Sequence, residues 1–385
     1  MTVVSRVSTM KPNGKVIRVM VVDDSIVIRG LISRWLNALD DIEVIVACRN
    51  GQDAVDQIAK ANVDLVVLDI EMPVMDGLTA LPLLLKASPG VRVLMASTLT
   101  RRNANISMKA LALGATDYVP KPEATKSGHA SAEFQEELIN RIRAIGGKKI
   151  GLRPRPVARA GVAAPAQRGA ESLSGAGGHK VDIATVTASR TKPKVLAIGS
   201  STGGPKALFE VFEGLKPILA KMPVVVTQHM PATFTAILAE HISGVTGGRC
   251  VEGVDGMKVE AGSVYVAPGG KHMLLKKRGA DVVIRLNDGE PVNFCKPAVD
   301  PMLESMVPIY GAGILSCILT GMGHDGCAGA QKVQSEGGTV IAQDEASSVV
   351  WGMPGAVAQA GICHKIVPLS QVAKTLVTLI NGGMA

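Results

Sequence analysis

The stretch KVLAIGSSTGGPKALFEVF, residues 194–212, decides the fold class of the second half of the chain. Its unbroken apolar run is typical of a parallel strand that is buried on both faces. A turn containing several glycines follows, and the apolar residues after it recur at helical spacing. The sequence therefore predicts a strand, a tight turn and a helix, the unit from which parallel α/β sheets are built.

Similar apolar runs occur throughout both halves of the chain. In the second half they are MPVVVTQH (222–229), GSVYVAPG (262–269), GILSCILTG (313–321) and GGTVIAQD (337–344), and in the first half VIRVMVV (16–22), VDLVVLD (63–69), VRVLMAS (91–97) and TDYVP (116–120). We therefore expect the fold class α/β, with two doubly wound domains around mainly parallel sheets. In such sheets the chemistry gathers in loops beyond the carboxyl ends of the strands.

The net charge of +8 belongs to one segment between the two halves. Residues 141–194 carry 12 Lys and Arg against 2 Asp and Glu, whereas the parts on either side are each close to neutral. Residues 146–192 are rich in Ala, Gly, Pro, Ser and Arg, a composition that cannot bury enough apolar surface to become ordered. We expect domains at 16–145 and 193–385, joined by a flexible basic linker at 146–192.

The cysteines and the hydropathy pattern limit the location of the protein. The six cysteines include no C-x-x-C pair, which argues against a zinc knuckle, a redox dithiol motif and a disulfide framework. No apolar run approaches the roughly 18–20 residues that span a bilayer. We expect a soluble cytoplasmic protein without an integral membrane segment.

Carboxylates are expected to converge at one edge of the first sheet. Asp23 and Asp24 follow the first predicted strand, and Asp69 ends another. Such a group of oxygen ligands suits Mg²⁺. Ser97 and Lys121 at later strand ends would add a hydroxyl and an ammonium, and this combination suits phosphoryl transfer to Asp69. Taken singly, each aspartate could instead cap a following helix or turn.

The turn after residue 199 places a serine hydroxyl beside the start of a helix. Gly199 and Gly204 have the spacing of a Walker A loop, but Pro205 stands where that loop needs lysine and no hydroxyl residue follows Lys206. The spacing of the glycines does not fit a dinucleotide fingerprint either. A simple anion-binding turn remains an alternative to a nucleophile. Reasoning from the residues alone does not distinguish Ser200 from Ser201 as the nucleophile.

A serine nucleophile needs a base and an acid that orients the base. His229 ends the run at 222–229, and Asp325 lies in a glycine-rich loop after another predicted strand. His272, in PGGKHM, is a rival for the base. The sequence predicts that Asp325 and one of these histidines meet the serine at the carboxyl edge of the second sheet.

The first half resembles the receiver domain of bacterial response regulators, which has a flavodoxin-like fold. The resemblance is carried by DD at 23–24, LDIEMPVMDG (68–77), ST (97–98) and YVPKP (118–122). It implies that Asp69 is the phosphoacceptor and that Mg²⁺ binds at Asp23, Asp24 and Asp69. It further implies a switch hydroxyl, a switch aromatic residue and a phosphate-sensing lysine, at Ser97, Tyr118 and Lys121.

The second half resembles the catalytic domain of chemotaxis protein-glutamate methylesterases, a Rossmann-like serine hydrolase. The matching motifs are GSSTGGPKAL (199–208), TQHMPATFT (227–235), VYVAPGGKHM (264–273), LTGMGHDG (319–326) and AQDEASSVVWGMPGAV (342–357). The resemblance implies Ser201 as nucleophile, His229 as general base and Asp325 as orienting acid. Thr202 and the backbone at Met322 would border the site, and the esterase reaction would need no cofactor.

The resemblance as a whole implies an enzyme of chemotactic adaptation. Its substrates would be glutamate γ-methyl esters, and some glutamines, on methyl-accepting chemoreceptors in receptor arrays. A chemotaxis histidine kinase would phosphorylate the receiver and so activate the esterase. A DNA-binding second half is a weaker alternative, because residues 195–385 are nearly neutral and contain no helix-turn-helix pattern, so no nucleic-acid partner is expected. A serine hydrolase acting on another substrate is a further alternative.

Overall fold

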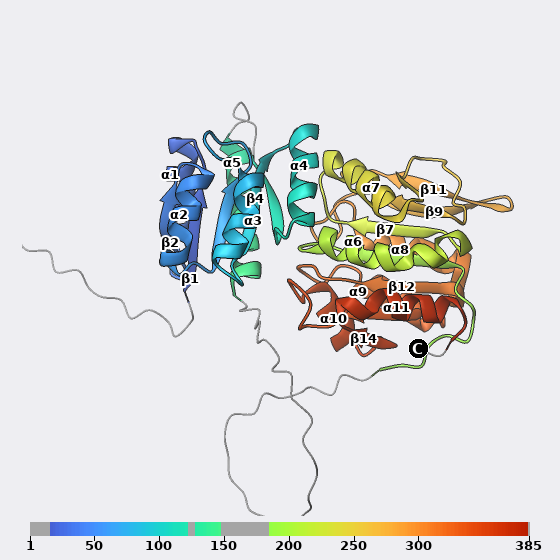
Figure 1. Ribbon diagram of the computed structural model, residues 1–385. Helices are drawn as coiled ribbons and strands as arrows, with labels where there is room; N and C mark the ends of the chain where they lie inside the picture. The colour runs from blue at the N-terminus through green and yellow to red at the C-terminus, as the bar shows by residue number, and fades with distance from the viewer. Residues whose placement is uncertain (1–15, 122–127, 148–184, 384–385) are drawn as a thin grey trace, which may run out of the picture.

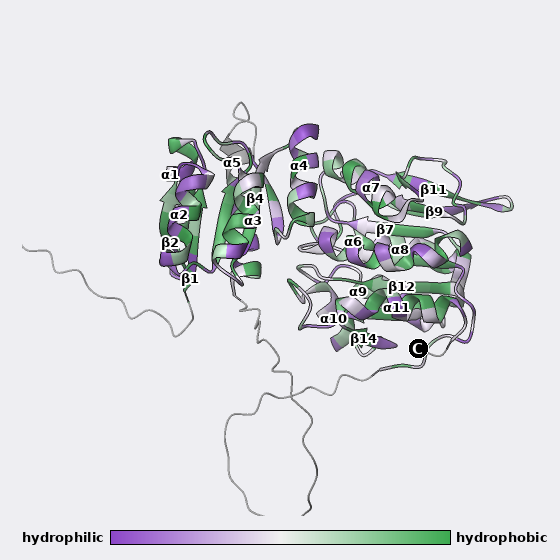
Figure 2. Ribbon diagram, viewed as in Figure 1, coloured by the Kyte–Doolittle hydropathy of each residue, from purple (hydrophilic) through white to green (hydrophobic). Residues whose placement is uncertain are grey.

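The computed structural model describes residues 16–121, 128–147 and 185–383, without the side chains of residues 128–131. The chain forms two α/β units that lie side by side (Figure 1). Each unit is built around a parallel sheet, so the predicted fold class is confirmed. The strands are largely apolar in Figure 2, whereas polar residues gather on the helices. No helix in the described ranges is long and apolar enough to cross a membrane.

The first unit contains a five-stranded parallel sheet in the order β2-β1-β3-β4-β5. Its strands are β1 (Ile17–Val22), β2 (Ile42–Cys48), β3 (Leu65–Asp69), β4 (Arg92–Thr98) and β5 (Asp117–Lys121), and its helices are α1 (Ile26–Asn37), α2 (Gly51–Ala61), α3 (Gly77–Ala87), α4 (Arg101–Ala112) and α5 (Gly128–Gly146). Side chains of Ser25, Asn50, Asp76 and Thr100 cap the first four helices. Because β1 and β3 are neighbours, the residues that follow them meet at one edge.

The second unit contains a seven-stranded parallel sheet in the order β14-β13-β12-β6-β7-β9-β8, and a separate antiparallel hairpin β10-β11. Its strands are β6 (Val195–Ser200), β7 (Val224–Gln228), β8 (Arg249–Glu252), β9 (Ser263–Val266), β10 (His272–Arg278), β11 (Asp281–Asn287), β12 (Ile314–Ile318), β13 (Thr339–Gln343) and β14 (Lys365–Val367). Its helices are α6 (Gly204–Leu215), η1 (Lys216–Lys221), α7 (Ala232–Thr246), α8 (Val299–Tyr310), η2 (Gly311–Gly313), α9 (Cys327–Ser335), α10 (Met353–Gln359) and α11 (Leu369–Ile380).

The strands that the apolar runs did not predict lie at the sheet edges or in the hairpin. β2, β8 and β14 are edge strands, and all three are only partly buried. In the hairpin, β10 ends in exposed charged residues before a glycine turn at Gly279, whose φ is 63°. Without burial on both faces, none of these strands needs a continuous apolar run.

Most of the predicted linker, residues 146–192, lies outside the described residues. Its last part is described, and there the backbone N–H of Val186 donates to the carbonyl of Cys363 at 2.9 Å. The backbone N–H of Ser189 donates to Thr339 Oγ1 at 2.9 Å. The part of the chain that contacts the second unit therefore begins before residue 193, where the second domain was expected to start.

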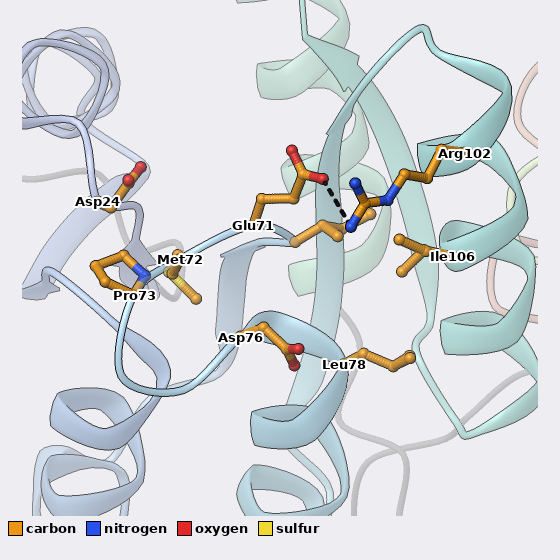
Figure 3. A pocket seen from close by; sticks show the side chains of 9 residues that line it. Asp24, Glu71, Met72, Pro73, Asp76, Leu78, Arg102 and Ile106 are labelled. Carbon is orange, nitrogen blue, oxygen red and sulfur yellow. Dashed lines mark ion pairs between the residues drawn. The ribbon is translucent and has the colours of Figure 1, made fainter.

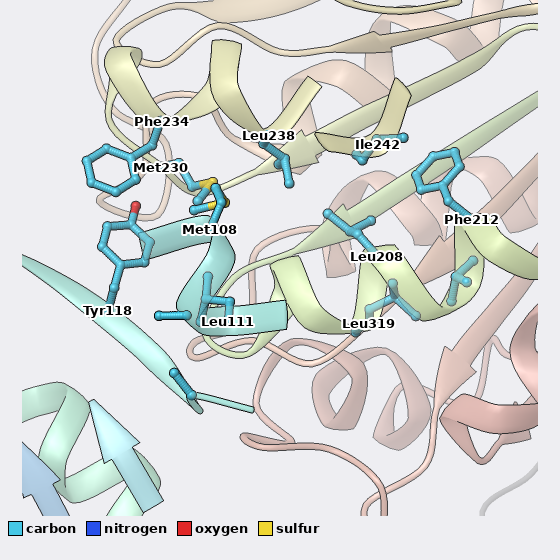
Figure 4. Close-up of a cluster of buried hydrophobic side chains, with 14 of the residues drawn as sticks. Met108, Leu111, Tyr118, Leu208, Phe212, Met230, Phe234, Leu238, Ile242 and Leu319 are labelled. Atoms are coloured by element: carbon cyan, nitrogen blue, oxygen red, sulfur yellow. The ribbon is translucent and has the colours of Figure 1, made fainter. Parts of the chain in front are cut away.

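The two units share an apolar contact between α4 and the helices α6 and α7. Met108, Leu111 and Tyr118 of the first unit belong to the same buried cluster as Phe234 and Leu238 of the second (Figure 4). The rings of Tyr118 and Phe234 are stacked, with centroids 4.3 Å apart and an angle of 9° between planes. The contact therefore buries an aromatic side chain of β5, near the amino end of that strand.

Polar bonds flank this apolar contact on α4 and α7. Arg101 Nη2 lies 2.6 Å from Glu240 Oε1, and His241 Nε2 lies 3.2 Å from Asn105 Oδ1. Burial and the charge of Lys109 hold the pKa of His241 below its ordinary value. These contacts give the apolar interface a defined orientation.

Candidate functional site

A cavity of about 1020 Å³ lies between the two units. Its walls on the second unit include Ser201, Thr202, His229, Met322 and Asp325, which are all the residues predicted for the esterase site. Its opposite wall is formed by residues of α5, namely Glu133, Glu136, Glu137, Asn140 and Arg141. The structure thus brings the predicted catalytic residues together and places the first unit across from them.

The turn after β6 distinguishes the two adjacent serines. Ser200 is fully buried, and its hydroxyl donates to Gln228 Oε1 at 2.7 Å. Ser201 is partly exposed and lines the cavity. The turn requires glycine: Gly203 has a φ of 75°, and a Cβ on Gly204 would lie 2.0 Å from Gln228 Oε1. Only Ser201 therefore presents its hydroxyl to a ligand in the cavity.

His229 and Asp325 form a buried hydrogen-bonded pair. His229 Nε2 lies 2.8 Å from Asp325 Oδ2, and the same oxygen accepts the backbone N–H of Val299 at 2.6 Å, at the start of α8. Burial alone would raise the pKa of Asp325, but its hydrogen bonds from His229, Val299 and Asn293 hold the pKa below its ordinary value. Asp325 is therefore suited to orient the imidazole and to stabilise its protonated form.

Both nitrogens of the His229 ring are in contact with a side chain. Nδ1 lies 3.2 Å from Cys295 Sγ, opposite the bond to Asp325. Burial alone would lower the pKa of His229, but Asp325 and Cys295 raise it to about 9. Within the described part of the chain, the hydroxyl of Ser201 has no hydrogen bond. The base and the candidate nucleophile thus line one cavity without being bonded to each other.

His272, the rival for the base, has a structural role. Its Nδ1 accepts the backbone N–H of Ala298 at 3.2 Å, and its Nε2 lies 3.0 Å from the carbonyl of Glu290. It is 2% exposed and is absent from the cavity wall. The position of His272 therefore favours His229 as the general base.

Thr202 and Met322 border the cavity on two different loops. The carbonyl of Thr202 accepts the hydroxyl of Thr320 at 2.9 Å, which ties the turn after β6 to the loop after β12. In the described residues, the backbone N–H groups of Thr202 and Met322 have no hydrogen-bond partner. They are candidates to bind an oxyanion beside Ser201.

Carboxylates converge at the edge of the first sheet as predicted. Oxygens of Asp23, Asp24 and Asp69 lie within 4.8 Å of one another. Lys121 Nζ lies 2.6 Å from Asp23 Oδ2 and 2.7 Å from Asp69 Oδ1. Burial raises the pKa of Asp69, although Lys121 opposes the shift. A compact set of carboxylates with one exposed member, Asp24, fits a hydrated Mg²⁺ ion.

A pocket of about 450 Å³ adjoins this acidic site (Figure 3). Asp24 lies on one side of it, and Glu71 and Arg102 form an ion pair on another, with 3.8 Å between Arg102 Nη2 and Glu71 Oε1. The pocket thus lies next to the carboxylates, with Asp24 in its wall.

The two predicted switch residues lie on neighbouring strands, β4 and β5, on the face of the first sheet that α4 covers. The hydroxyl of Ser107 on α4 lies 3.0 Å from the Ser97 hydroxyl, and no bond between Ser97 and Asp69 is found in the described ranges. Tyr118 lies in the interface against Phe234. The Tyr118 hydroxyl is buried without a hydrogen-bond partner among the described residues. Both residues thus connect the sheet to the surface that faces the second unit.

Comparison with known proteins identifies the family. A response regulator receiver domain matches residues 19–133, and a CheB methylesterase domain matches residues 196–376. A protein-glutamate methylesterase/protein-glutamine glutaminase of Nitrobacter hamburgensis is 52% identical over 366 residues, which cover 95% of this chain and 94% of that protein. The chain belongs to the CheB methylesterase family. Receiver domains of such regulators undergo Mg²⁺-dependent phosphorylation.

Other CheB relatives are similarly close. A protein-glutamate methylesterase/protein-glutamine glutaminase of a group 2 operon in Rhodopseudomonas palustris is 50% identical over 375 residues, with 95% of each chain covered. The crystal structure of the CheB catalytic domain of Thermotoga maritima is 39% identical and covers 49% of this chain and 100% of its own, with a TM-score of 0.47. The relatives of Nitrobacter hamburgensis and Rhodopseudomonas palustris, at 52% and 50% identity, confirm the family resemblance drawn from the motifs.

Several residues at the candidate esterase site were not predicted from the sequence. Asn293 and Cys295, which touch Asp325 and His229, lie in the stretch PVNFCKP at 291–297, which has no strand or helix pattern. Arg141 of α5 also lines the cavity, and it lies outside the motifs that carry the family resemblance. The asparagine between two prolines was the one available signal, because asparagine tolerates strained turns.

Proposed function

We propose that this chain is an esterase that hydrolyses glutamate γ-methyl esters on chemoreceptors and deamidates receptor glutamines. The observation that carries the proposal is the cavity in which Ser201 is exposed beside the 2.8 Å pair of His229 and Asp325. The names of the relatives supply the substrate class. A serine, a base and an acid that orients the base suffice for acyl transfer.

The reaction begins with attack of Ser201 Oγ on the ester carbonyl. His229 accepts the serine proton while Asp325 holds the ring and stabilises its charge. The carbonyl oxygen becomes negative and receives hydrogen bonds from the backbone N–H groups of Thr202 and Met322. The C–O bond to the methoxy group then breaks, and His229 returns the proton so that methanol leaves.

Water completes the reaction on the acyl-enzyme. His229 removes a proton from water, the hydroxide attacks the carbonyl, and Ser201 leaves with the proton from His229. The product is the free glutamate carboxylate. A glutamine follows the same route with ammonia in place of methanol. Because Nε2 of His229 is bonded to Asp325, the proton must be accepted at Nδ1, so the Cys295 contact has to give way for turnover.

Control is proposed to begin at the acidic site. Asp69 would accept a phosphoryl group from a chemotaxis histidine kinase, with Asp23, Asp24 and Asp69 holding Mg²⁺. Mg²⁺ bound there supplies positive charge against the phosphoryl oxygens. Lys121, which bridges Asp23 and Asp69, is placed to bind the new phosphate.

The unphosphorylated receiver is proposed to restrict access to the esterase site. The α5 wall of the catalytic cavity and the stack of Tyr118 on Phe234 support this proposal. Movement of Ser97 toward the phosphate would strain its bond to Ser107 on α4, the helix that contacts α7. Phosphorylation thereby biases the contact between the units toward release.

The proposed setting is the cytoplasm, at receptor arrays. The partners are the methyl-accepting receptors and the kinase, without nucleic acid. The basic linker, which lies outside most of the described chain, would contribute attraction to acidic receptor or membrane surfaces.

Methanol release from methylated receptor membranes tests the nucleophile. Ser201→Ala is expected to abolish release, because its hydroxyl is the one exposed to the cavity. Ser200→Ala is the matched control: it removes the bond to Gln228, so it is expected to lower thermal stability more than it lowers the rate. Activity retained in Ser201→Ala and lost in a folded Ser200→Ala would overturn the assignment.

A further inference from the structure

Asn293 bridges two buried carboxylates behind the base. Its Nδ2 donates to Asp325 Oδ1 at 3.1 Å and to Asp300 Oδ2 at 3.0 Å. Asp325 is 1% exposed and Asp300 is 6% exposed, so water screens neither charge well. One amide group therefore touches both carboxylates on the side of the His229–Asp325 pair.

Apart from the bond between His229 and Asp325, the other hydrogen bonds of the two carboxylates come from backbone N–H groups at the starts of α8 and α9. Val299 and Asp300 donate to Asp325 at 2.6 and 3.2 Å, and Gly329 donates to Asp300 Oδ1 at 2.7 Å. In the described ranges, Asn293 is the only side chain that donates to both carboxylates. The amide of Asn293 is thus a donor shared by Asp300 and Asp325, whereas each backbone N–H at the two helix starts donates to only one of them.

The local backbone is shaped to place this amide. Asn293 and Phe294 have φ values of 52° and 63°, in the left-handed region that side chains rarely adopt. Val292 and Cys295 close the turn with two mutual backbone hydrogen bonds, at 3.0 and 2.9 Å. Cys295, in turn, contacts His229. The turn at 292–295 therefore touches the acid through one residue and the base through another, and such strain is typical of functional sites.

The charges explain why a shared donor is needed. Burial raises the pKa of Asp300, and the charge of Asp325 raises it further, with a smaller contribution from Glu304. Two carboxylates in this situation compete for one proton. A proton on Asp325 would remove the negative charge that orients His229. A donor that stabilises both ionised forms therefore protects the function of Asp325.

We infer that Asn293 is a positioning residue of the esterase, which keeps Asp325 ionised and directed toward His229 by donating one amide N–H to each carboxylate. The inference deepens the proposed function and rests on its assignment of Ser201, His229 and Asp325. It adds the turn at 292–295 to the parts of the chain on which the reaction depends.

The test replaces Asn293 with glycine. Asn293→Gly removes the amide and at the same time relaxes the positive φ, so a loss of rate cannot be attributed to backbone strain. Asn62→Gly is the matched control, because Asn62 is an exposed asparagine with a φ of 45° at the end of α2 in the receiver. The control is expected to behave as the wild type does.

The first readout is the rate at which a phosphonate ester labels Ser201 in the full-length chain. This rate depends on the base but needs no receptor. Asn293→Gly is expected to lower it about 10- to 100-fold, the range for losing a hydrogen bond to a charged group. In methanol release, the loss is expected in kcat rather than in KM. In a pH titration followed by the ¹³C signals of the aspartate carboxyls, Asn293→Gly is expected to shift the titration of the Asp300 and Asp325 pair to higher pH.

Asp300→Asn gives a second test that leaves the turn intact. As a single variant, Asp300→Asn places a side-chain amide group opposite the amide of Asn293 and is expected to lower the labelling rate of Ser201. Combined with Asn293→Gly, it removes the competing carboxylate and is expected to recover part of the rate. A merely structural role predicts instead that the double variant is worse than either single variant.

The outcomes separate this inference from the proposed function. Wild-type labelling in Asn293→Gly, or a slower rate without a carboxyl shift and without recovery in the double variant, overturns the role of Asn293. If Ser201 is labelled normally but methylated receptors release no methanol, the substrate proposal fails and the role of Asn293 stands. If the wild type is not labelled at Ser201, both fail.

Discussion

The ion pair between Arg101 and Glu240 offers a direct test of the contact between receiver and catalytic unit. Arg101 Nη2 lies 2.6 Å from Glu240 Oε1, and the two side chains are 75% and 51% exposed. The pair joins α4 to α7 at the edge of the apolar interface and lies outside the esterase cavity. Arg101→Glu therefore weakens the contact between the units without altering Ser201, His229 or the acidic site.

The size of the effect follows from the exposure of the pair. An exposed ion pair contributes about 0.2–1 kcal/mol, and reversing one charge adds a repulsion of similar size. The docked arrangement should lose about 0.5–2 kcal/mol in all. At about 1.4 kcal/mol per tenfold change, the docking equilibrium shifts by a factor of about 2 to 30. Basal activity is expected to rise by up to that factor.

The assay is methanol release from methylated receptors without a phosphodonor. Arg102→Glu is the matched control: Arg102 is the next residue and is also exposed, but it pairs with Glu71 inside the receiver. The difference between the two variants should shrink at high salt, since the Debye length falls to about 3 Å at 1 M. The exchange Arg101→Glu with Glu240→Arg should return basal activity toward that of the wild type.

Two results would refute this reasoning. If Arg101→Glu leaves basal activity unchanged at low salt, the contact does not restrict the site. If Arg102→Glu raises it equally and the charge exchange restores nothing, the effect comes from net charge rather than from this pair.

Two further predictions concern the base and the acidic site. Asp325 and Cys295 raise the pKa of His229 from 6.5 to about 9, so labelling of Ser201 should increase as pH rises toward about 9; a rate independent of pH over this range would contradict this. The stabilisation of the fold by protonated His229 is complete below pH 6.5 and is lost as pH rises through about 9. Chemical unfolding at several pH values checks this second prediction. Chelation of Mg²⁺ should abolish the increase in methanol release on adding phosphodonor and leave the basal rate in place, because Asp23, Asp24 and Asp69 do not line the esterase cavity. An equal loss of basal activity would contradict this prediction.

The buried strands and the residues at their ends were accessible from the sequence. Asp69 is the last residue of β3, and Ser201 and His229 directly follow β6 and β7, so the ends of the apolar runs locate all three. The choice between Ser200 and Ser201 required either the family motif or the structure, because one hydroxyl is buried against Gln228 and both occupy the same local pattern. The choice between His229 and His272 as the base also required the motif or the structure, because no sequence pattern predicts the bonds of His272 to Ala298 and Glu290.

The contacts that modulate the site were not accessible in this way. Asn293 reaches Asp325 across 32 positions, from a turn whose left-handed backbone has no apolar periodicity. The α5 wall of the cavity depends on how two separately folded sheets pack, and that packing rests on Tyr118, Phe234 and their neighbours. Local patterns describe one element at a time, so they do not specify an interface between units.

The Tyr118 hydroxyl has a consequence for how readily the receiver lets go of the catalytic unit. A buried hydroxyl without a partner costs about 1–3 kcal/mol, and this hydroxyl has none among the described residues. Separation of the units would return it to water, so hydration favours the open form even while ring stacking favours the closed one. The ring of Tyr118 thus stabilises the closed form, while the hydroxyl of the same side chain stabilises the open form. Because the two contributions oppose each other, a small free-energy change from phosphorylation at Asp69 is enough to shift the equilibrium.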